Sequence, residues 1–139
     1  MEPIKKLITQ ANTQINHERG QFSRNLGITG IQMSVIDFMA NHHNHVSQQE
    51  IEQEFGIRRS TTTIMIKRME RHGLVHQIPD PTDKRKKLVE LTDKAIQLIN
   101  PIKEFIKNDD LQIRQAFSDD ELAVACKILN YIREDQLNG

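Results

Sequence analysis

The chain has 139 residues, a formal net charge of zero, 37% hydrophobic residues and no tryptophan, which fits one domain with an aliphatic core. Its one cysteine excludes an internal disulfide framework and cysteine-based zinc fingers. No apolar run reaches the roughly 18 residues that cross a bilayer, and Lys5 and Lys6 interrupt the segment where a signal peptide would be apolar, so we expect a cytoplasmic protein without a membrane segment.

Two helices are predicted first. Apolar residues recur at helical spacing over residues 4–26, and Gly27 is a residue that can end the helix. Thr29 is a suitable N-cap for a second helix. The polar segment 41–45 interrupts the pattern and is predicted to be a loop. The apolar face of the second helix consists of Met33, Val35, Ile36, Phe38 and Met39.

Two further helices joined by a tight turn follow. Ser47 and Glu50 have the spacing of a capping box, in which each side chain bonds the backbone N–H at the other position. Gly56 supplies the turn, and the next helix is predicted over residues 59–72. One face of that helix is expected to be buried, and it consists of Thr62, Met65, Ile66 and Met69. This order of elements predicts a helix-turn-helix.

A basic hairpin is predicted after the helix-turn-helix. Residues 74–78 and 87–91 have strand propensity, and the segment between them is rich in turn formers. From Arg58 to Lys87, nine Lys or Arg residues stand against three acids, a net charge of +6, so the rest of the chain carries −6. Such segregation indicates a site for a polyanion. The helix and hairpin together predict a winged, DNA-binding helix-turn-helix.

Two long helices are predicted at the C-terminal end. Thr92 caps the first, whose apolar stripe continues to residue 106 and which Pro101 should kink. Ser118 and Glu121 form a second capping box that opens the last helix. The residues of the last helix predicted to face inward are Leu122, Ala125, Leu129 and Ile132. Because so small a chain offers these helices little else to pack on, we expect a partner subunit to cover them.

Residues 47–92 resemble the MarR (multiple-antibiotic-resistance regulator) family. The similarity rests on SQQEI at 47–51, MERHGLV at 69–75 and DPTDKRKKLVELT at 80–92, which carries the family's Asp-x-x-Asp-x-Arg wing signature. It implies a mainly α fold with a small β-hairpin, with one domain over residues 1–139. A winged helix-turn-helix at about 28–91 would be flanked by dimerisation helices at about 1–27 and 92–139. The implied function is a homodimeric, sequence-specific transcriptional regulator, which we expect to be a repressor bound to a pseudo-palindromic double-stranded DNA operator.

The candidate DNA-binding residues lie on the helix-turn-helix and the wing. Arg59 or Arg68, on the helix predicted over residues 59–72, can pair with guanine in the major groove. Ile64 and the threonine methyls of the same helix can contact a thymine methyl. The resemblance implies that Arg85 enters the minor groove, where the negative potential favours a cation. Asp83 is expected to hold the wing or pair with an arginine. The full predicted set is Ser47, Gln48, Arg58, Arg59, Ser60, Thr61, Thr63, Ile64, Arg68, Asp83, Arg85 and Lys86.

Three residues depart from the family pattern. Ile64 stands where the family often has a polar or basic residue that contacts a base, which favours base contacts from Thr63 or Arg68. Glu52 stands where a small residue usually lets the two helices cross closely. Thr82 replaces a common wing Arg or Lys and lowers the charge of the wing by one.

Family members often release DNA when a small amphipathic, frequently phenolic, effector enters a crevice beside the DNA-reading unit. Candidate lining residues are Ile15, Phe22, Met33 and Ile36, although ordinary core packing is the stronger interpretation. The histidines at 42, 43 and 45 form a cluster, for which a solvated loop outweighs zinc sensing, and no metal or other cofactor is predicted. Cys126 is expected to be a buried small apolar residue rather than a redox sensor.

Two alternatives to this function remain, and a third class of protein, an enzyme, is not predicted. A winged-helix module that binds protein without binding DNA has no reason to concentrate positive charge on its helix and wing. An enzyme is not predicted, because the sequence holds no P-loop, Gly-x-Gly-x-x-Gly, nucleophile elbow or metalloprotease motif. A zinc- or redox-sensing member of the same family is the remaining alternative.

Overall fold

The computed structural model describes the backbone of residues 1–138 and the side chains of residues 1–134. These residues fall into one compact unit from Met1 to Ile102 and a second that begins at Lys103. Within the described residues, no helix is both long enough and apolar enough to cross a membrane.

The first unit begins with the two predicted helices. α1 (Ile4–Asn25) is continuous, and the chain leaves it through Gly27, which has the left-handed φ of 75° that favours glycine. α2 (Gly30–Ala40) begins after Thr29, whose hydroxyl accepts the N–H of Gln32. The side chain of Gln32 accepts the Thr29 N–H in return. This capping box fixes where α2 starts and confirms Thr29 as the N-cap.

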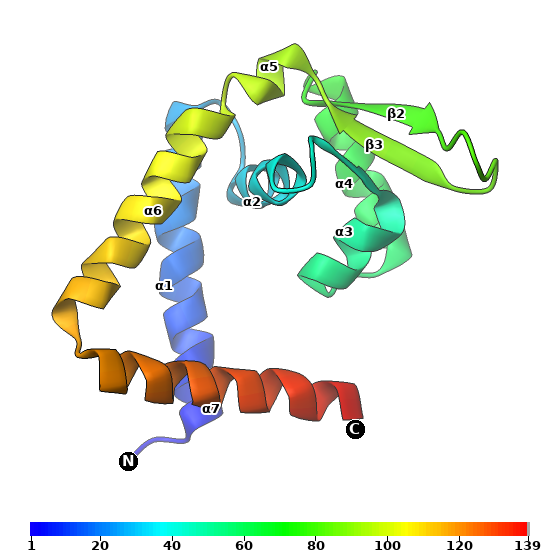
Figure 1. The fold of residues 1–139 in the computed structure, drawn as a ribbon. Helices are drawn as coiled ribbons and strands as arrows, with labels where there is room; N and C mark the ends of the chain where they lie inside the picture. Colours follow the sequence, from blue (N-terminus) through cyan, green and yellow to red (C-terminus); the bar gives the residue numbers. More distant parts are fainter. Residues whose placement is uncertain (139) are drawn as a thin grey trace. The chain divides into compact units, whose positions relative to one another are not determined.

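A three-stranded antiparallel sheet has the order β1-β3-β2. Its strands are β1 (His45–Ser47), β2 (Val75–Pro79) and β3 (Lys87–Leu91). Val89 in the central strand lies opposite Val46 on one side and Gln77 on the other. The predicted hairpin is confirmed, with its first strand shifted by one residue. We call residues 75–91 the wing, and Figure 1 shows it beside α4.

The loop predicted over residues 41–45 is wrong at its C-terminal end. A turn occupies residues 41–44, in which His43 and Asn44 have left-handed φ values of 60° and 69°. β1 begins at the next residue. Three residues are too few to show the alternation of a strand, and their pairing partner β3 lies far along the chain. Only tertiary pairing therefore makes this segment a strand.

The predicted helix-turn-helix is confirmed. α3 (Gln48–Phe55) opens with the expected capping box, in which the Glu50 N–H donates to Ser47 Oγ and the Ser47 N–H donates to Glu50 Oε1, both at 3.1 Å. Gly56 has φ of 60° and turns the chain with the left-handed geometry that glycine adopts freely. α4 (Arg59–Arg71) follows.

The core of the first unit lies between α2, α3, α4 and the sheet. The completely or almost completely buried residues of this core include Met33, Ile36, Met39, Ile51, Ile66, Met69, Leu74 and Val89. On α4, Thr62 is also buried, whereas Met65 is half-buried. The Thr62 hydroxyl donates to the Arg58 carbonyl at 2.9 Å, so its polar atom is satisfied inside the core.

The single kinked helix predicted after Thr92 is wrong. The structure has a short α5 (Asp93–Ile96) and a separate α6 (Ile99–Ala116). Pro101 has no N–H to donate to the carbonyl of Gln97, and its ring would clash with that carbonyl in a continuous helix. The helix therefore breaks one turn earlier, and the proline falls in the first turn of α6, where it is tolerated.

The last helix opens as predicted. α7 (Asp119–Asn138) is preceded by Ser118, whose Oγ accepts the Glu121 N–H at 3.2 Å. The Glu121 carboxylate accepts the Ser118 N–H at 3.0 Å. Hydrogen bonding of the Glu121 carboxylate, first by the backbone N–H of Ser118 and then by the Ser118 side chain, lowers the pKa of Glu121 below its ordinary value.

The apolar side chains of α7 are more exposed than predicted. Leu122 and Ile132 are half-buried, but Ala125 and Leu129 are exposed. Cys126 is exposed as well, so the prediction that it is buried is wrong. A helix buries side chains only against other elements. Within the described residues the second unit contains only α7 and most of α6, which are too few to enclose these side chains.

Candidate nucleic-acid interface

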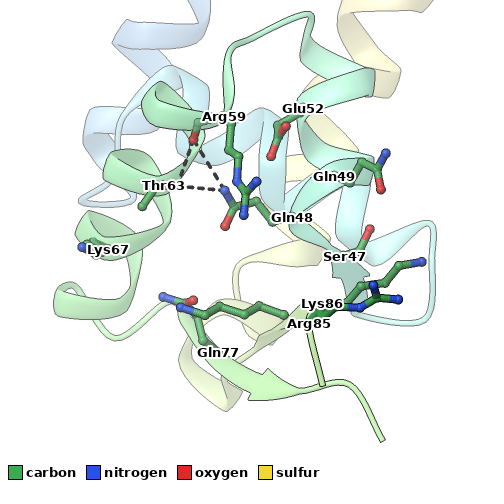
Figure 2. A pocket seen from close by; sticks show the side chains of 11 residues that line it. Ser47, Gln48, Gln49, Glu52, Arg59, Thr63, Lys67, Gln77, Arg85 and Lys86 are labelled. Carbon is green, nitrogen blue, oxygen red and sulfur yellow. Dashed lines mark hydrogen bonds between the residues drawn. The ribbon is translucent and has the colours of Figure 1, made fainter. Parts of the chain in front are cut away.

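A concavity of about 550 Å³ lies between the start of α3, α4 and the wing, and we call it the basic concavity. It is lined by Ser47, Gln48, Gln49, Glu52, Arg59, Thr63, Lys67, Gln77, Arg85, Lys86 and Lys87. Five of these residues are cationic and one is acidic. Figure 2 shows their side chains around the shared space. Such a cluster of positive charge attracts a polyanion more strongly than separate surface lysines would.

A hydrogen-bond network fixes α3 against the first turns of α4. Gln48 Nε2 donates to Thr63 Oγ1 at 2.8 Å and reaches the Arg59 carbonyl at 3.5 Å (Figure 2). The Thr63 hydroxyl donates to the same Arg59 carbonyl at 2.9 Å. The first residue of α3 thereby sets the position of the helix that carries Arg59 into the concavity.

The turn of the wing is built by two aspartates. Asp80 Oδ1 accepts the N–H and the hydroxyl of Thr82, both at 2.8 Å, and these bonds lower the pKa of Asp80. Asp80 therefore closes an Asx-type turn. The turn also gives a local reason for the threonine at position 82, because the Thr82 hydroxyl donates one of the hydrogen bonds that form the turn.

Asp83 pairs with the wing arginine as predicted. Its Oδ1 accepts the Arg85 N–H at 3.0 Å and Arg85 Nε–H at 3.3 Å. The Arg85 side chain is nevertheless 91% exposed, whereas that of Asp83 is 29% exposed. Asp83 thus orients Arg85 through the backbone N–H and Nε–H, and the two terminal nitrogens of the guanidinium remain available to a ligand.

The structure brings together half of the predicted site. Ser47, Gln48, Arg59, Thr63, Arg85 and Lys86 line the basic concavity. The other predicted residues do not line it, and these are Arg58, Ser60, Thr61, Ile64, Arg68 and Asp83. Lys67, and not Arg68, lines the basic concavity at this part of α4. Arg68 follows Lys67 and so lies about 100° further around α4.

Sequence reasoning missed four polar or cationic residues of the concavity, namely Gln49, Lys67, Gln77 and Lys87. Lys67 carried a usable signal, because it follows Thr63 by four residues and so shares its helix face. Gln77 is placed by the register of β2, and its backbone and side-chain N–H groups reach the Glu70 carboxylate at 3.4 and 3.5 Å. That contact between wing and α4 depends on tertiary packing.

The two other departures from the family pattern also have definite places. Glu52 is half-buried and is the acid that lines the basic concavity. Ile64 is 54% exposed on α4.

The candidate effector residues are divided between core and surface. Met33 and Ile36 are completely buried, Phe22 is half-buried, and Ile15 is 42% exposed. His42 and His45 bond backbone carbonyls through Nδ1, at 2.9 and 3.2 Å. Among the side chains that the structure describes, no group of three His, Cys, Asp or Glu is arranged to hold a metal ion.

The chain is similar to known regulators along most of its length. The sequence model of the MarR family matches residues 26–86. A curated relative, the HTH-type transcriptional regulator BilQ of Clostridioides difficile (strain CD3), is 29% identical over 94 residues. This match covers 68% of the chain and 64% of BilQ, so the chain spans less than two thirds of that relative.

Two solved structures have the same fold. The transcription regulator MarR from Oenococcus oeni PSU-1 is 30% identical, with a TM-score of 0.83 over 95% of this chain and 99% of the other. The MepR of S. aureus, solved as a complex with DNA, gives a TM-score of 0.87 at 16% identity, over 98% of this chain and 99% of the other. At that identity the second similarity concerns the fold alone.

Proposed function

The chain belongs to the MarR family of transcriptional regulators, and from this premise we propose that it is a cytoplasmic, homodimeric repressor of a pseudo-palindromic DNA operator. Residues of about 28–91 would read the DNA, and the flanking helices would form the dimer. The family is one of regulators and not of enzymes.

The observation that carries DNA binding is the basic concavity. Two elements supply its cations, with Arg59 and Lys67 on α4 and three consecutive basic residues on the wing. In a winged helix-turn-helix, the recognition helix enters a major groove while the wing reaches the adjacent backbone or minor groove. The 91% exposed side chain of Arg85 is available for that second contact.

The proposed dimer is supported by apolar side chains that the single chain leaves uncovered. Ile4 and Ile15 on α1, Ile113 on α6, and Val124 and Leu129 on α7 are all more than 40% exposed. In a two-fold symmetric dimer, the partner subunit would cover these helices, and the two copies of α4 would lie one turn of DNA apart. This arrangement would account for a pseudo-palindromic operator.

We also propose that a small amphipathic or phenolic molecule releases the DNA. Of the four candidate contacts, Ile15 and Phe22 are accessible, whereas the fully buried Met33 and Ile36 are part of the core. An effector would therefore meet the side of α1 first. Weaker operator binding on addition of such molecules, with no loss of helix content, is the expected result of a screen.

The test of DNA binding begins with selection of bound duplexes from a random pool. Fluorescence anisotropy then gives Kd over a range of salt concentrations. The log–log slope should be about −0.9 for each phosphate contacted. Arg85→Ala should weaken binding by about 1–3 kcal/mol, because it withdraws a cationic side chain from a groove of the DNA. Lys84→Ala removes the same charge outside the concavity and is the matched control.

Two results would contradict this proposal. A pool that yields no selected sequence, together with a Kd that does not change with salt, would favour a winged-helix module that binds protein. Equal losses of affinity in the Arg85 and Lys84 variants would mean that only net charge matters, and would remove Arg85 from the interface.

A further inference from the structure

We propose that Ile64 reads the 5-methyl group of a thymine in each operator half-site. Contact between apolar groups, in addition to positive charge, would then specify the sequence that the protein binds. This inference rests on the proposed function, because it requires α4 to lie in a major groove.

Ile64 lies on the side of α4 opposite to the core. Thr62 and Ile66 are 0% and 1% exposed, whereas Ile64 between them is 54% exposed. Two residues along a helix turn the side chain by about 200°. Ile64 is therefore held out by the same packing that buries Thr62 and Ile66, and its exposure does not come from a loose helix end.

The surroundings of Ile64 favour DNA over a protein partner. Its neighbours at helical spacing are Ser60, Thr61, Lys67 and Arg68, all of which are exposed. A single apolar side chain among hydroxyls and cations is not the wide apolar patch on which a protein docks. Hydroxyls and cations bind phosphates, and the thymine methyl is the apolar group that a major groove presents.

The hydrogen bonds next to Ile64 strengthen this inference. A hydroxyl has one hydrogen to donate, and that of Thr63 is given to the Arg59 carbonyl at 2.9 Å. One of its acceptor positions is taken by Gln48 Nε2 at 2.8 Å. Thr63 thus has no hydrogen left for the acceptors of guanine or thymine. The methyl contact of Ile64 would add sequence readout at this part of α4.

The experiment exchanges thymine for uracil, which removes only the 5-methyl group. In the selected palindromic duplex, each symmetric pair of thymines is replaced in turn, and Kd is measured by anisotropy. Burial of one methyl corresponds to about a fourfold change in affinity, so a pair of substitutions at the contacted position should weaken binding by about sixteenfold. Pairs at the other positions should have little effect.

Two variants assign the effect to a residue. The Ile64→Ala protein should bind the thymine duplex more weakly than the wild type does. It should bind the thymine and uracil duplexes with the same Kd. It should remain folded, because the site is exposed and alanine favours helices, and thermal unfolding checks this. Lys67→Ala should weaken binding to both duplexes equally and should keep the preference for thymine, so it is the control for a general decrease in affinity.

The outcomes separate this inference from the proposed function. Failure of the wild type to bind any duplex would overturn both. Specific binding without a preference for thymine at any position would overturn the reading by Ile64 and leave DNA binding intact. The proposed reading of thymine by Ile64 would also be overturned by a selected half-site without thymine, or by an Ile64→Ala protein that still prefers thymine.

Discussion

The winged-helix part of the chain and its last helix place their apolar side chains differently. Between α2 and β3, residues such as Met33, Ile51 and Ile66 are at most 1% exposed. On α7, Val124 and Leu129 are 55% and 48% exposed. One chain therefore completes the core of the DNA-reading part but leaves α7 uncovered. The first part can hold its shape by internal packing, whereas α7 needs another surface, which the proposed dimer supplies.

The largest expected effect comes from placing a charge on α7. Leu129→Asp should convert the dimer to a monomer, because a buried carboxylate without a partner is costly. Affinity for a duplex with two half-sites should fall by about 10²–10⁴-fold when the two sites are no longer linked. Sedimentation equilibrium measures the mass, and anisotropy measures the affinity.

Asn130→Asp adds the same charge one residue further along α7, at another exposed position. It should leave the mass unchanged. A dimer that persists in the Leu129→Asp protein would show that α7 is not where the subunits meet.

A second comparison uses two isoleucines on α4. Ile66→Ala should lower the free energy of unfolding by about 2–5 kcal/mol, because it empties space in a closed core. Ile64→Ala should change it by less than about 0.5 kcal/mol, because its side chain is 54% exposed. Denaturant unfolding followed by circular dichroism measures both. Equal decreases would mean that α4 packs differently from the structure.

A smaller effect is expected from the contact between α3 and α4. Gln48→Ala removes the donor to Thr63 Oγ1 and should cost about 0.5–1.5 kcal/mol, seen both in unfolding and in operator affinity. Gln53→Ala removes another glutamine of α3, which is exposed and does not line the basic concavity, and is the control. No difference between the two variants would mean that the Gln48 bond does not position the recognition helix.

The smallest effect concerns the wing at acid pH. The pKa of Asp80 is lowered from 3.8 by its bonds to Thr82. A lowered pKa means that the stabilisation is fully present above 3.8 and is lost as the pH falls through the folded-state value. The Thr82 amide resonance should therefore stay constant down to that range and shift below it. A shift near neutral pH would contradict the turn.

Most of the fold could be predicted from local signals. The capping boxes at Ser47 and Ser118 mark true helix starts, because a cap is formed by residues three apart. The burial of Thr62 and Ile66 follows from helical spacing. β1 could not be predicted, because its three residues become a strand only by pairing with β3.

The site could be predicted only where local patterns place its residues, and not where tertiary pairing places them. Arg59 and Arg85 were recognisable from a helix start and a wing motif. Gln77 and Lys87 enter the basic concavity through the register of the sheet, which local sequence patterns do not determine. The exposure of Cys126 depends on how few elements surround α7, and a periodic pattern cannot show how many neighbours a helix has.

The most direct test of the central claim is protection of lysines from acetylation by a selected operator duplex, read by mass spectrometry. DNA bound in the basic concavity should protect Lys67, Lys86 and Lys87, which line it, and should leave the labelling of Lys107 on α6 and Lys127 on α7 unchanged. Equal labelling of the three concavity lysines with and without DNA, or protection confined to Lys107 and Lys127, would contradict that claim.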